Sequence, residues 1–264
     1  MNIFLRELKA NLKSLLIWSG IMVAFVFMGI AKFSAYEGNP EMLEILDSMP
    51  PAMLSAFQMN AFNLTTITGF FGVMFTYFAL LTTISATMWG SDIIAKEERD
   101  KTVEFSLTLP VSRPKLITAK IFAAVVNCIA FLIIMWIASI ASAAPYKPDA
   151  EFYNFLSLSM ATLFIMQMIF LAVGVFLGCA MKQYKRAGSI AVGLLMGTYF
   201  ISIVSGLNEN LDFLKYFSPF TYFDRVQLLN ESTVEPVYLL LSLGIIIVAY
   251  IGAYVSYSRR DLYI

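Results

Sequence analysis

The sequence predicts an all-α polytopic membrane protein with six transmembrane helices in a single domain, and three observations lead to this fold class. The chain has 264 residues, of which 59% are hydrophobic, and its mean hydropathy is +0.75. Only 14% of the residues are charged, whereas soluble domains carry about 25%. Six apolar runs are long enough to cross a hydrocarbon core of about 30 Å. They are expected at residues 15–31, 69–89, 121–144, 156–181, 188–207 and 236–257.

Residues 2–14 precede the first span and place apolar and basic side chains on different helical faces. The apolar face has Phe4, Leu8, Leu12 and Leu15, and the basic face has Arg6, Lys9 and Lys13. This pattern is typical of an amphipathic helix that lies at the lipid surface, with its bases toward anionic headgroups. We therefore expect an N-terminal interfacial helix, and the alternative is a simple positive flank of the first span.

Three external loops are expected, at residues 32–68, 145–155 and 208–235. The first should form two short amphipathic helices interrupted at Pro50 and Pro51, because proline breaks a helix. These helices would either belong to an external gate or lie on the outer membrane surface. The last loop has an aromatic run at residues 216–223 that suits the membrane–water interface.

Small residues at GxxxG spacing occur twice in the spans and let helices approach closely. One pair is Gly174 and Gly178, and the other is Gly193 and Gly197. Each pair could mark packing within the subunit or a seam between two copies.

Residues 90–120 form the longest charged stretch, with 11 charged side chains. A charge in mid-bilayer costs roughly 2.5–3.5 kcal/mol, so this stretch should lie in water between two spans. Good helix formers predict a helix over residues 96–109 that ends at Pro110. Ser112 can then cap a second helix with Pro114 in its first turn, which leads into the third span.

The same stretch resembles the first cytoplasmic loop of ABC-2-type ABC transporter permeases. The resemblance is carried by three parts of the stretch: the acidic pattern EExDxT, the glutamate that follows it, and the LPVSR corner. The matching positions are Glu97, Glu98, Asp100, Thr102, Glu104, Leu109, Pro110, Val111, Ser112 and Arg113, with Arg99 and Phe105 between them. A SPF element at residues 218–220 and an RRDL ending after the last span are also similar to this family.

The resemblance implies that residues 96–113 form a coupling helix that docks on a separate ABC ATPase subunit. It further implies an exporter with two ATPase copies and a second permease copy or a homologous permease. ATP and Mg²⁺ would be bound by the ATPase, and no cofactor or metal is expected in this chain. The expected location is the plasma membrane of a prokaryote.

The distribution of basic residues predicts the orientation. With residues 90–120 inside, 14 of the 18 bases fall on the internal side and 4 on the external side. This asymmetry follows the positive-inside rule and places both termini in the cytoplasm.

Several kinds of chemistry have no signature in the sequence. The chain has no histidine, which is the commonest general base and metal ligand. It has no P-loop motif for ATP, and its net charge of zero gives no basic field for nucleic acid. The two cysteines, Cys128 and Cys179, fall in apolar runs and should be reduced and buried.

No acidic or basic side chain falls within the six spans as drawn, which argues against an ion-coupled carrier. Spans rich in phenylalanine, methionine, leucine and hydroxyl residues suit an amphipathic or hydrophobic cargo, such as a membrane-active peptide, an antibiotic or a lipid-like molecule. The alternative function is a non-transporting membrane scaffold that recruits a soluble partner through its cytoplasmic loop. An intramembrane enzyme lacks a visible nucleophile and base.

Overall fold

The computed structural model describes residues 3–39, 41, 44, 48–50, 54, 62–99, 111–207, 209–230 and 233–259. Within these residues, all regular structure is helical. Six helices are long and apolar enough to cross a membrane, which confirms the predicted fold class. They are α1 (Ile3–Phe33), α4 (Ile67–Arg99), α6 (Arg113–Ala143), α7 (Ala150–Ala180), α8 (Tyr184–Ser205) and α10 (Pro236–Arg259).

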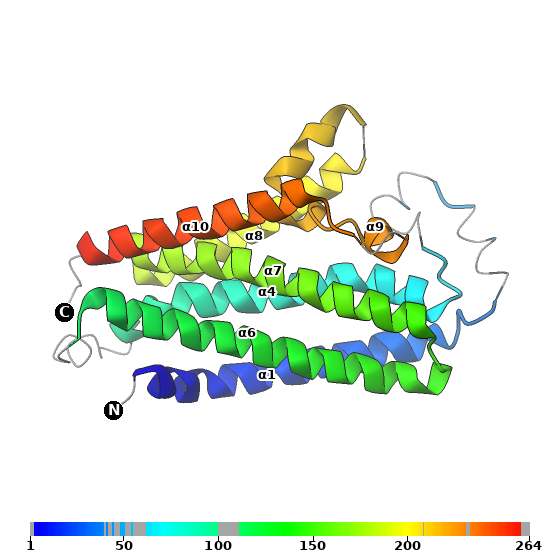
Figure 1. Ribbon diagram of the computed structural model, residues 1–264, viewed down its shortest axis with the longest axis horizontal. Coiled ribbons are helices and arrows are strands. Elements are labelled where there is room, and N and C mark those ends of the chain that lie inside the picture. Colours follow the sequence, from blue (N-terminus) through cyan, green and yellow to red (C-terminus); the bar gives the residue numbers. More distant parts are fainter. Residues whose placement is uncertain are drawn as a thin grey trace.

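The long helices lie side by side in one bundle, and both chain termini are at the same end (Figure 1). We call this end, where α1 begins and α4 ends, the terminal end, and the other the opposite end. Figure 1 shows α8 and α10 on one side, α1 and α6 on the other, and α4 and α7 between them. The two central helices are the most buried of the six, and α10 and α8 are the least buried.

Helices α4 and α7 approach each other through glycines. A Cβ atom added to Gly174 would lie 2.6 Å from the carbonyl oxygen of Thr87, and one added to Gly178 would lie 2.6 Å from that of Ser91. From the other side, a Cβ atom on Gly90 would lie 2.5 Å from the carbonyl oxygen of Leu171. The first GxxxG pair therefore packs within the subunit, as one of the two predicted alternatives stated.

The second GxxxG pair has different surroundings. A Cβ atom at Gly193 or Gly197 would meet no atom within 4 Å in the described chain. This pair lies on a surface of α8 that the described residues leave open.

The helices extend beyond the predicted spans at the terminal end. Helix α4 continues past Trp89 to Arg99, and α6 begins at Arg113, where a helix leading into the third span was predicted. Charged side chains in these extensions form ion pairs, although the stretch 90–120 was expected to lie in water. Residues 3–14 likewise belong to the same unbroken helix as the first span. The interfacial helix expected at residues 2–14 is therefore not a separate element.

The backbone at the corner before the third span has the predicted conformation. Ser112 occupies the N-cap position of α6, and Pro114 lies in the first turn. The Ser112 side chain makes no capping hydrogen bond, however, so the stop at this position comes from the extended backbone and the proline. The predicted helix at residues 96–109 begins as the last turn of α4, and its remainder lies outside the described residues.

The segment between α8 and α10 packs against the bundle. It contains η2 (Glu209–Phe217), η3 (Pro219–Thr221) and α9 (Arg225–Asn230). The Ser218 hydroxyl donates to the carbonyl oxygen of Thr198 on α8 at 2.8 Å. The Phe220 ring lies 5.4 Å from the rings of both Phe170 and Tyr199.

The aromatic run expected at the membrane–water interface is divided between the surface and the core. Tyr216 and Phe217 are exposed, whereas Tyr222 and Phe223 are buried in the core. The short helices expected on either side of Pro50 and Pro51 lie largely outside the described residues.

Replacement of Gly174 by alanine should destabilise the bundle, because the new methyl group would force α4 and α7 apart. Overpacking of this kind costs about 1–3 kcal/mol. We expect Gly174→Ala to lower the thermal unfolding temperature of the purified chain in lipid nanodiscs. Gly193→Ala is the matched control and should leave stability unchanged or slightly raised, since alanine favours a helix by about 1 kcal/mol over glycine. Equal losses in both variants would contradict the assignment of the first pair to internal packing.

Candidate functional site

The residues predicted to couple the chain to an ATPase fall into three groups. Glu97, Glu98 and Arg99 form the last turn of α4 in the described chain, and Val111, Ser112 and Arg113 form the corner at the start of α6. The others lie outside the described residues: Asp100, Thr102, Glu104, Phe105, Leu109 and Pro110.

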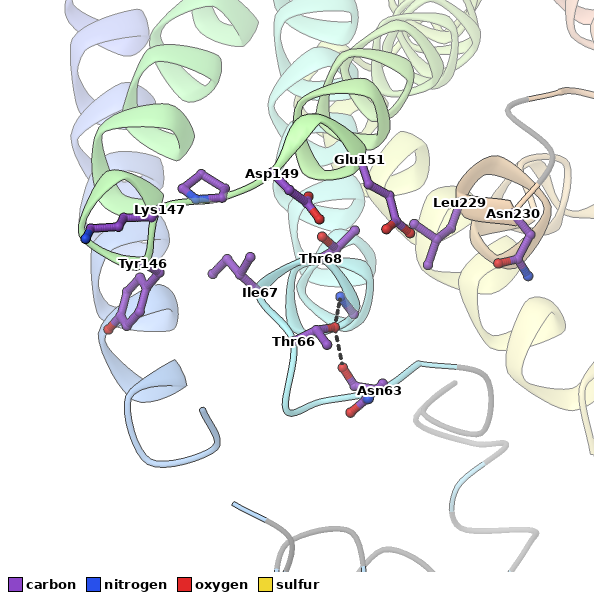
Figure 2. A pocket seen from close by; sticks show the side chains of 12 residues that line it. Asn63, Thr66, Ile67, Thr68, Tyr146, Lys147, Asp149, Glu151, Leu229 and Asn230 are labelled. Atoms are coloured by element: carbon purple, nitrogen blue, oxygen red, sulfur yellow. Dashed lines mark hydrogen bonds between the residues drawn. The ribbon is translucent and has the colours of Figure 1, made fainter. Parts of the chain in front are cut away.

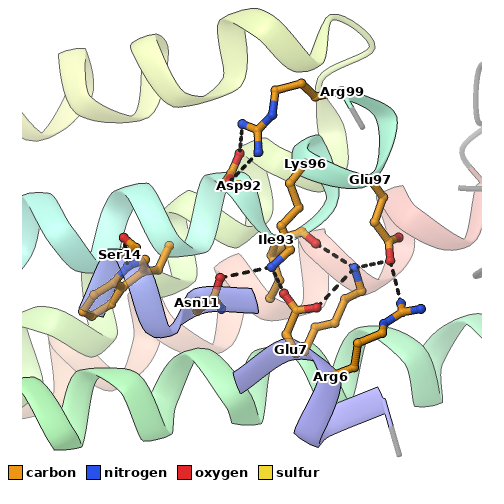
Figure 3. A network of polar contacts seen from close by, with 11 residues as sticks. Arg6, Glu7, Asn11, Ser14, Asp92, Ile93, Lys96, Glu97 and Arg99 are labelled. Atoms are coloured by element: carbon orange, nitrogen blue, oxygen red, sulfur yellow. Dashed lines mark hydrogen bonds and ion pairs between the residues drawn. The ribbon is translucent and has the colours of Figure 1, made fainter. Parts of the chain in front are cut away.

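Glu97 points into the bundle. Its side chain is 7% exposed, and Oε1 accepts from Lys120 Nζ at 2.8 Å and from an Arg6 guanidinium nitrogen at 3.2 Å. Lys120 lies on α6 and Arg6 on α1, so one carboxylate on α4 joins three helices. Figure 3 shows Arg6 and Glu97 facing each other across the α1–α4 contact.

A second carboxylate reaches the same place from α1. Glu7 is 3% exposed and forms an ion pair with Lys96 on α4. Its other oxygen lies 3.9 Å from Lys120 Nζ. Lys96 also donates to the Asn11 side-chain oxygen at 3.1 Å. We refer to Arg6, Glu7, Lys96, Glu97 and Lys120 as the ion cluster.

Lys120 has the most enclosed charge of the ion cluster, because its side chain is fully buried. Besides the two carboxylates, its ammonium group donates to the carbonyl oxygen of Ile93 at 2.9 Å. An ammonium group without such partners would be costly to remove from water. Each carboxylate therefore compensates a cation that sits on another helix.

Glu97 and Glu98 belong to the stretch that was expected to lie in water, but both side chains are buried. Glu98 is 9% exposed, and Glu97 is 6% exposed as a whole residue. The prediction failed because the partners of Glu97 lie 91 residues before it and 23 after it, on other helices. No local pattern shows that contact.

Other side chains at this end face outward. Arg99 pairs with Asp92 at 3.0 Å, and their side chains are 54% and 43% exposed. Val111 and Ser112 are exposed as well. The outward-facing residues thus flank the segment 100–110 on both sides.

Arg113 connects α6 to the end of α10. Its guanidinium group donates to the carbonyl oxygens of Tyr257 and Ser258, both at 3.3 Å. The last carbonyls of a helix lack partners within the helix, and a cation there also complements the helix dipole. One turn further along α6, the hydroxyls of Thr118 and Tyr254 lie 2.6 Å apart.

Sequence reasoning missed Arg6, Glu7 and Lys120 as members of the site. The one available signal was Glu7, a single acid between Arg6 and Lys9 on an otherwise basic stretch.

Arg225 was also missed, since it was counted as an external base. It is 9% exposed and donates to the carbonyl oxygen of Gly72 at 3.1 Å and to Thr76 Oγ1 at 2.6 Å. Arg225 therefore fastens α9 to α4 near the opposite end.

A cavity of about 450 Å³ opens at the opposite end of the bundle (Figure 2). It lies between the start of α4, the turn from α6 to α7 and the end of α9, with Thr68, Asp149 and Glu151 among its polar lining residues. Asp149 is occupied as the N-cap of α7, where it accepts from the Phe152 amide at 3.0 Å.

Within the described residues, no group of three or more acidic, cysteine or histidine side chains could hold a metal ion. Cys128 and Cys179 are buried thiols that are not joined in a disulfide, as predicted. The charged side chains of the ion cluster join α1, α4 and α6.

The family model described as "ABC-2 family transporter protein" matches residues 1–262, which is nearly the whole chain. A search of curated proteins finds no match to this chain.

Neutralising Glu97 should destabilise the protein itself. Glu97→Gln leaves Lys120 and Arg6 without their nearest carboxylate, and breaking a buried ion pair costs about 3–5 kcal/mol. We expect a clear drop in the thermal unfolding temperature in nanodiscs. Asp92→Asn, on the same helix, removes an exposed pair and should cost only about 0–1 kcal/mol. If Glu97→Gln were as stable as Asp92→Asn, the ion cluster would not be an internal contact.

Proposed function

Since the chain belongs to the ABC-2 family of transporter proteins, we propose that it is the membrane-spanning permease subunit of an ATP-driven exporter. The family match over residues 1–262 carries this proposal. The bundle of six membrane-length helices supports it, because such a bundle can line a path across a bilayer.

The energy would come from a separate ATPase. The sequence has no P-loop, so ATP and Mg²⁺ would bind to that partner. We assign the ATPase contact to the segment 100–110 together with the exposed side chains that flank it, Arg99, Val111 and Ser112. This assignment differs from the sequence-based one for Glu97 and Glu98, whose burial favours a role inside the permease.

A complete transporter would contain two ATPase copies and two permeases, the second being another copy of this chain or a homologue. The open surfaces of α8 and α10 leave room for lipid and for such a neighbour. The terminal end would face the cytoplasm of a prokaryotic cell, because the predicted internal segments hold 14 of the 18 bases.

The proposed cargo is an amphipathic or hydrophobic molecule, such as a membrane-active peptide, an antibiotic or a lipid-like compound. The long stretches between the helix ends have apolar side chains with a few hydroxyl and amide groups and no acidic or basic ones, for example residues 121–143 of α6 and 152–180 of α7. A charged hydrophilic cargo would find little to compensate its charge there. The direction of transport, outward, is part of the proposal.

Purification from the native membrane in mild detergent tests the partner. We expect a P-loop ATPase to accompany the chain at near-equal stoichiometry, identified by mass spectrometry. Glu104→Lys and Phe105→Ala should reduce the ATPase recovered, whereas Asp92→Asn should not. A different soluble protein in place of the ATPase would instead indicate the scaffold function and contradict the permease proposal.

Reconstitution with the ATPase in proteoliposomes tests the cargo class. A fluorescent amphipathic peptide should accelerate ATP hydrolysis and accumulate across the membrane only when ATP is present. A hydrophilic peptide of the same length and net charge serves as the control and should do neither. Equal stimulation by both peptides, or by neither, would count against an amphipathic cargo.

A further inference from the structure

The segment between α8 and α10 turns back along the bundle. Helix α8 ends at Ser205, and η2, which begins at Glu209, packs against it. The Ser218 hydroxyl, directly after η2, donates to the carbonyl oxygen of Thr198 at 2.8 Å. Thr198 lies about two helical turns, or about 10 Å, before the end of α8. The chain therefore returns toward the terminal end over this distance.

The length of α8 places the returning segment inside the bilayer. Its 22 residues extend over about 33 Å, which is close to the hydrocarbon thickness of about 30 Å. Lys185 and Arg186 lie in its first turn, where long basic side chains can reach the headgroups. The other end of α8 therefore coincides with the boundary of the hydrocarbon core at the opposite end of the bundle. Ser218 lies about 10 Å inside that boundary.

A contact with α10 agrees with this depth. The Tyr216 ring lies 6.2 Å from the ring of Tyr238, which is in the first turn of α10. Helix α10 is also of membrane length, with 24 residues. Figure 1 shows η2, in gold, on the outer side of the bundle, and α6 and α7 extend beyond it toward the opposite end. Thus η2 lies beside the membrane-spanning helices and does not project past them.

The side chains of η2 change from charged to aromatic toward its deeper end. The acidic residues Glu209 and Asp212 come in its first half, and Tyr216 and Phe217 come last. The exposed fractions of Phe213, Tyr216 and Phe217 are 58%, 48% and 64%. Large aromatic side chains exposed side by side are unfavourable in water, whereas contact with acyl chains removes them from it.

The backbone of this segment also suits lipid, because a 3₁₀ helix bonds most of its own amides. The last carbonyls of η2 have side-chain partners: Thr221 Oγ1 donates to that of Lys215, and the Tyr222 hydroxyl to that of Tyr216, both at 2.7 Å. Ser218, which follows the helix, is buried. The Lys215 ammonium group lies 5.6 Å from the centre of the Tyr216 ring, and its long stem can extend toward the headgroups.

We propose that η2 is a re-entrant element whose aromatic side chains contact the acyl chains of the leaflet at the opposite end. Phe200 and Val204 of α8, which are exposed in the same range of depth, present apolar side chains to the same leaflet. Part of the loop expected to be external, at residues 208–235, therefore lies inside the membrane. This inference requires only that the chain spans a bilayer, so it is independent of ATP-driven transport.

Spin labels at Phe213→Cys and Phe217→Cys test the lipid contact in liposomes, in a background with Cys128→Ala and Cys179→Ala. Collisions with oxygen, which concentrates in hydrocarbon, are compared with collisions with a water-soluble nickel chelate. We expect frequent oxygen and rare nickel collisions at position 217. The ratio should be smaller at position 213, which is nearer the boundary by about 8 Å at 2.0 Å per residue. Frequent nickel collisions at position 217 would overturn the inference.

Two reference positions calibrate these labels. Phe200→Cys on α8 is the lipid reference, and Glu151→Cys, exposed in the first turn of α7 at the opposite end, is the water reference. Rare collisions with both reagents at positions 213 and 217 would show that protein, such as a second copy of this chain, covers the surface. That result would also overturn the lipid contact.

Charge substitutions provide a measurement without labels. A carboxylate is more costly to place deep in hydrocarbon than near its boundary. Phe217→Asp should therefore lower the thermal unfolding temperature in nanodiscs by more than Phe213→Asp does. Equal unfolding temperatures of the two variants would overturn the inference even if the labelled variants failed to fold. Neither experiment includes the ATPase, so failure to find an ATPase partner would contradict the proposed function alone.

Discussion

A buried ammonium group needs carboxylate or carbonyl partners, and this requirement organises the terminal end of the bundle. Lys120 meets it with Glu97, Ile93 and Glu7, which come from two other helices. The position of each helix there depends on that of the other two. Burial would be unfavourable for any one of these charges alone, and it becomes acceptable only when α1, α4 and α6 meet in one register.

Helices α4 and α6, which precede and follow residues 100–110, make different contacts at the ends next to this segment. Helix α4 reaches the segment 100–110 just after Glu97, which is joined to α1 and α6. Helix α6 leaves the segment at Arg113, which binds the last carbonyls of α10. Force applied to residues 100–110 would thus act on α1 and α6 through one end and on α10 through the other. The two central helices, α4 and α7, are held together by glycine contacts that leave little room for adjustment.

Much of the fold could be predicted from the sequence, because apolar runs of membrane length identify spans without any knowledge of tertiary contacts. The corner at Ser112 and Pro114 was also predictable, since it depends on local backbone preferences. The pairing of the charged side chains was not predictable: a count of charges treats Lys96, Glu97 and Lys120 alike as solvated, while the structure pairs them inside the bundle. Likewise, Gly174 and Gly193 stand in identical spacing patterns, and only the neighbouring helices decide that the first is packed and the second is open.

The central claim is that the acidic pair at the end of α4 acts inside the bundle and that the proposed ATPase contact begins only at Arg99. A structure of the chain in complex with its ATPase tests this claim most directly. The account predicts that Glu97 remains bonded to Lys120 within the bundle and that ATPase side chains contact residues of the segment 100–110. A complex in which Glu97 or Glu98 turned outward and bonded to the ATPase would contradict it.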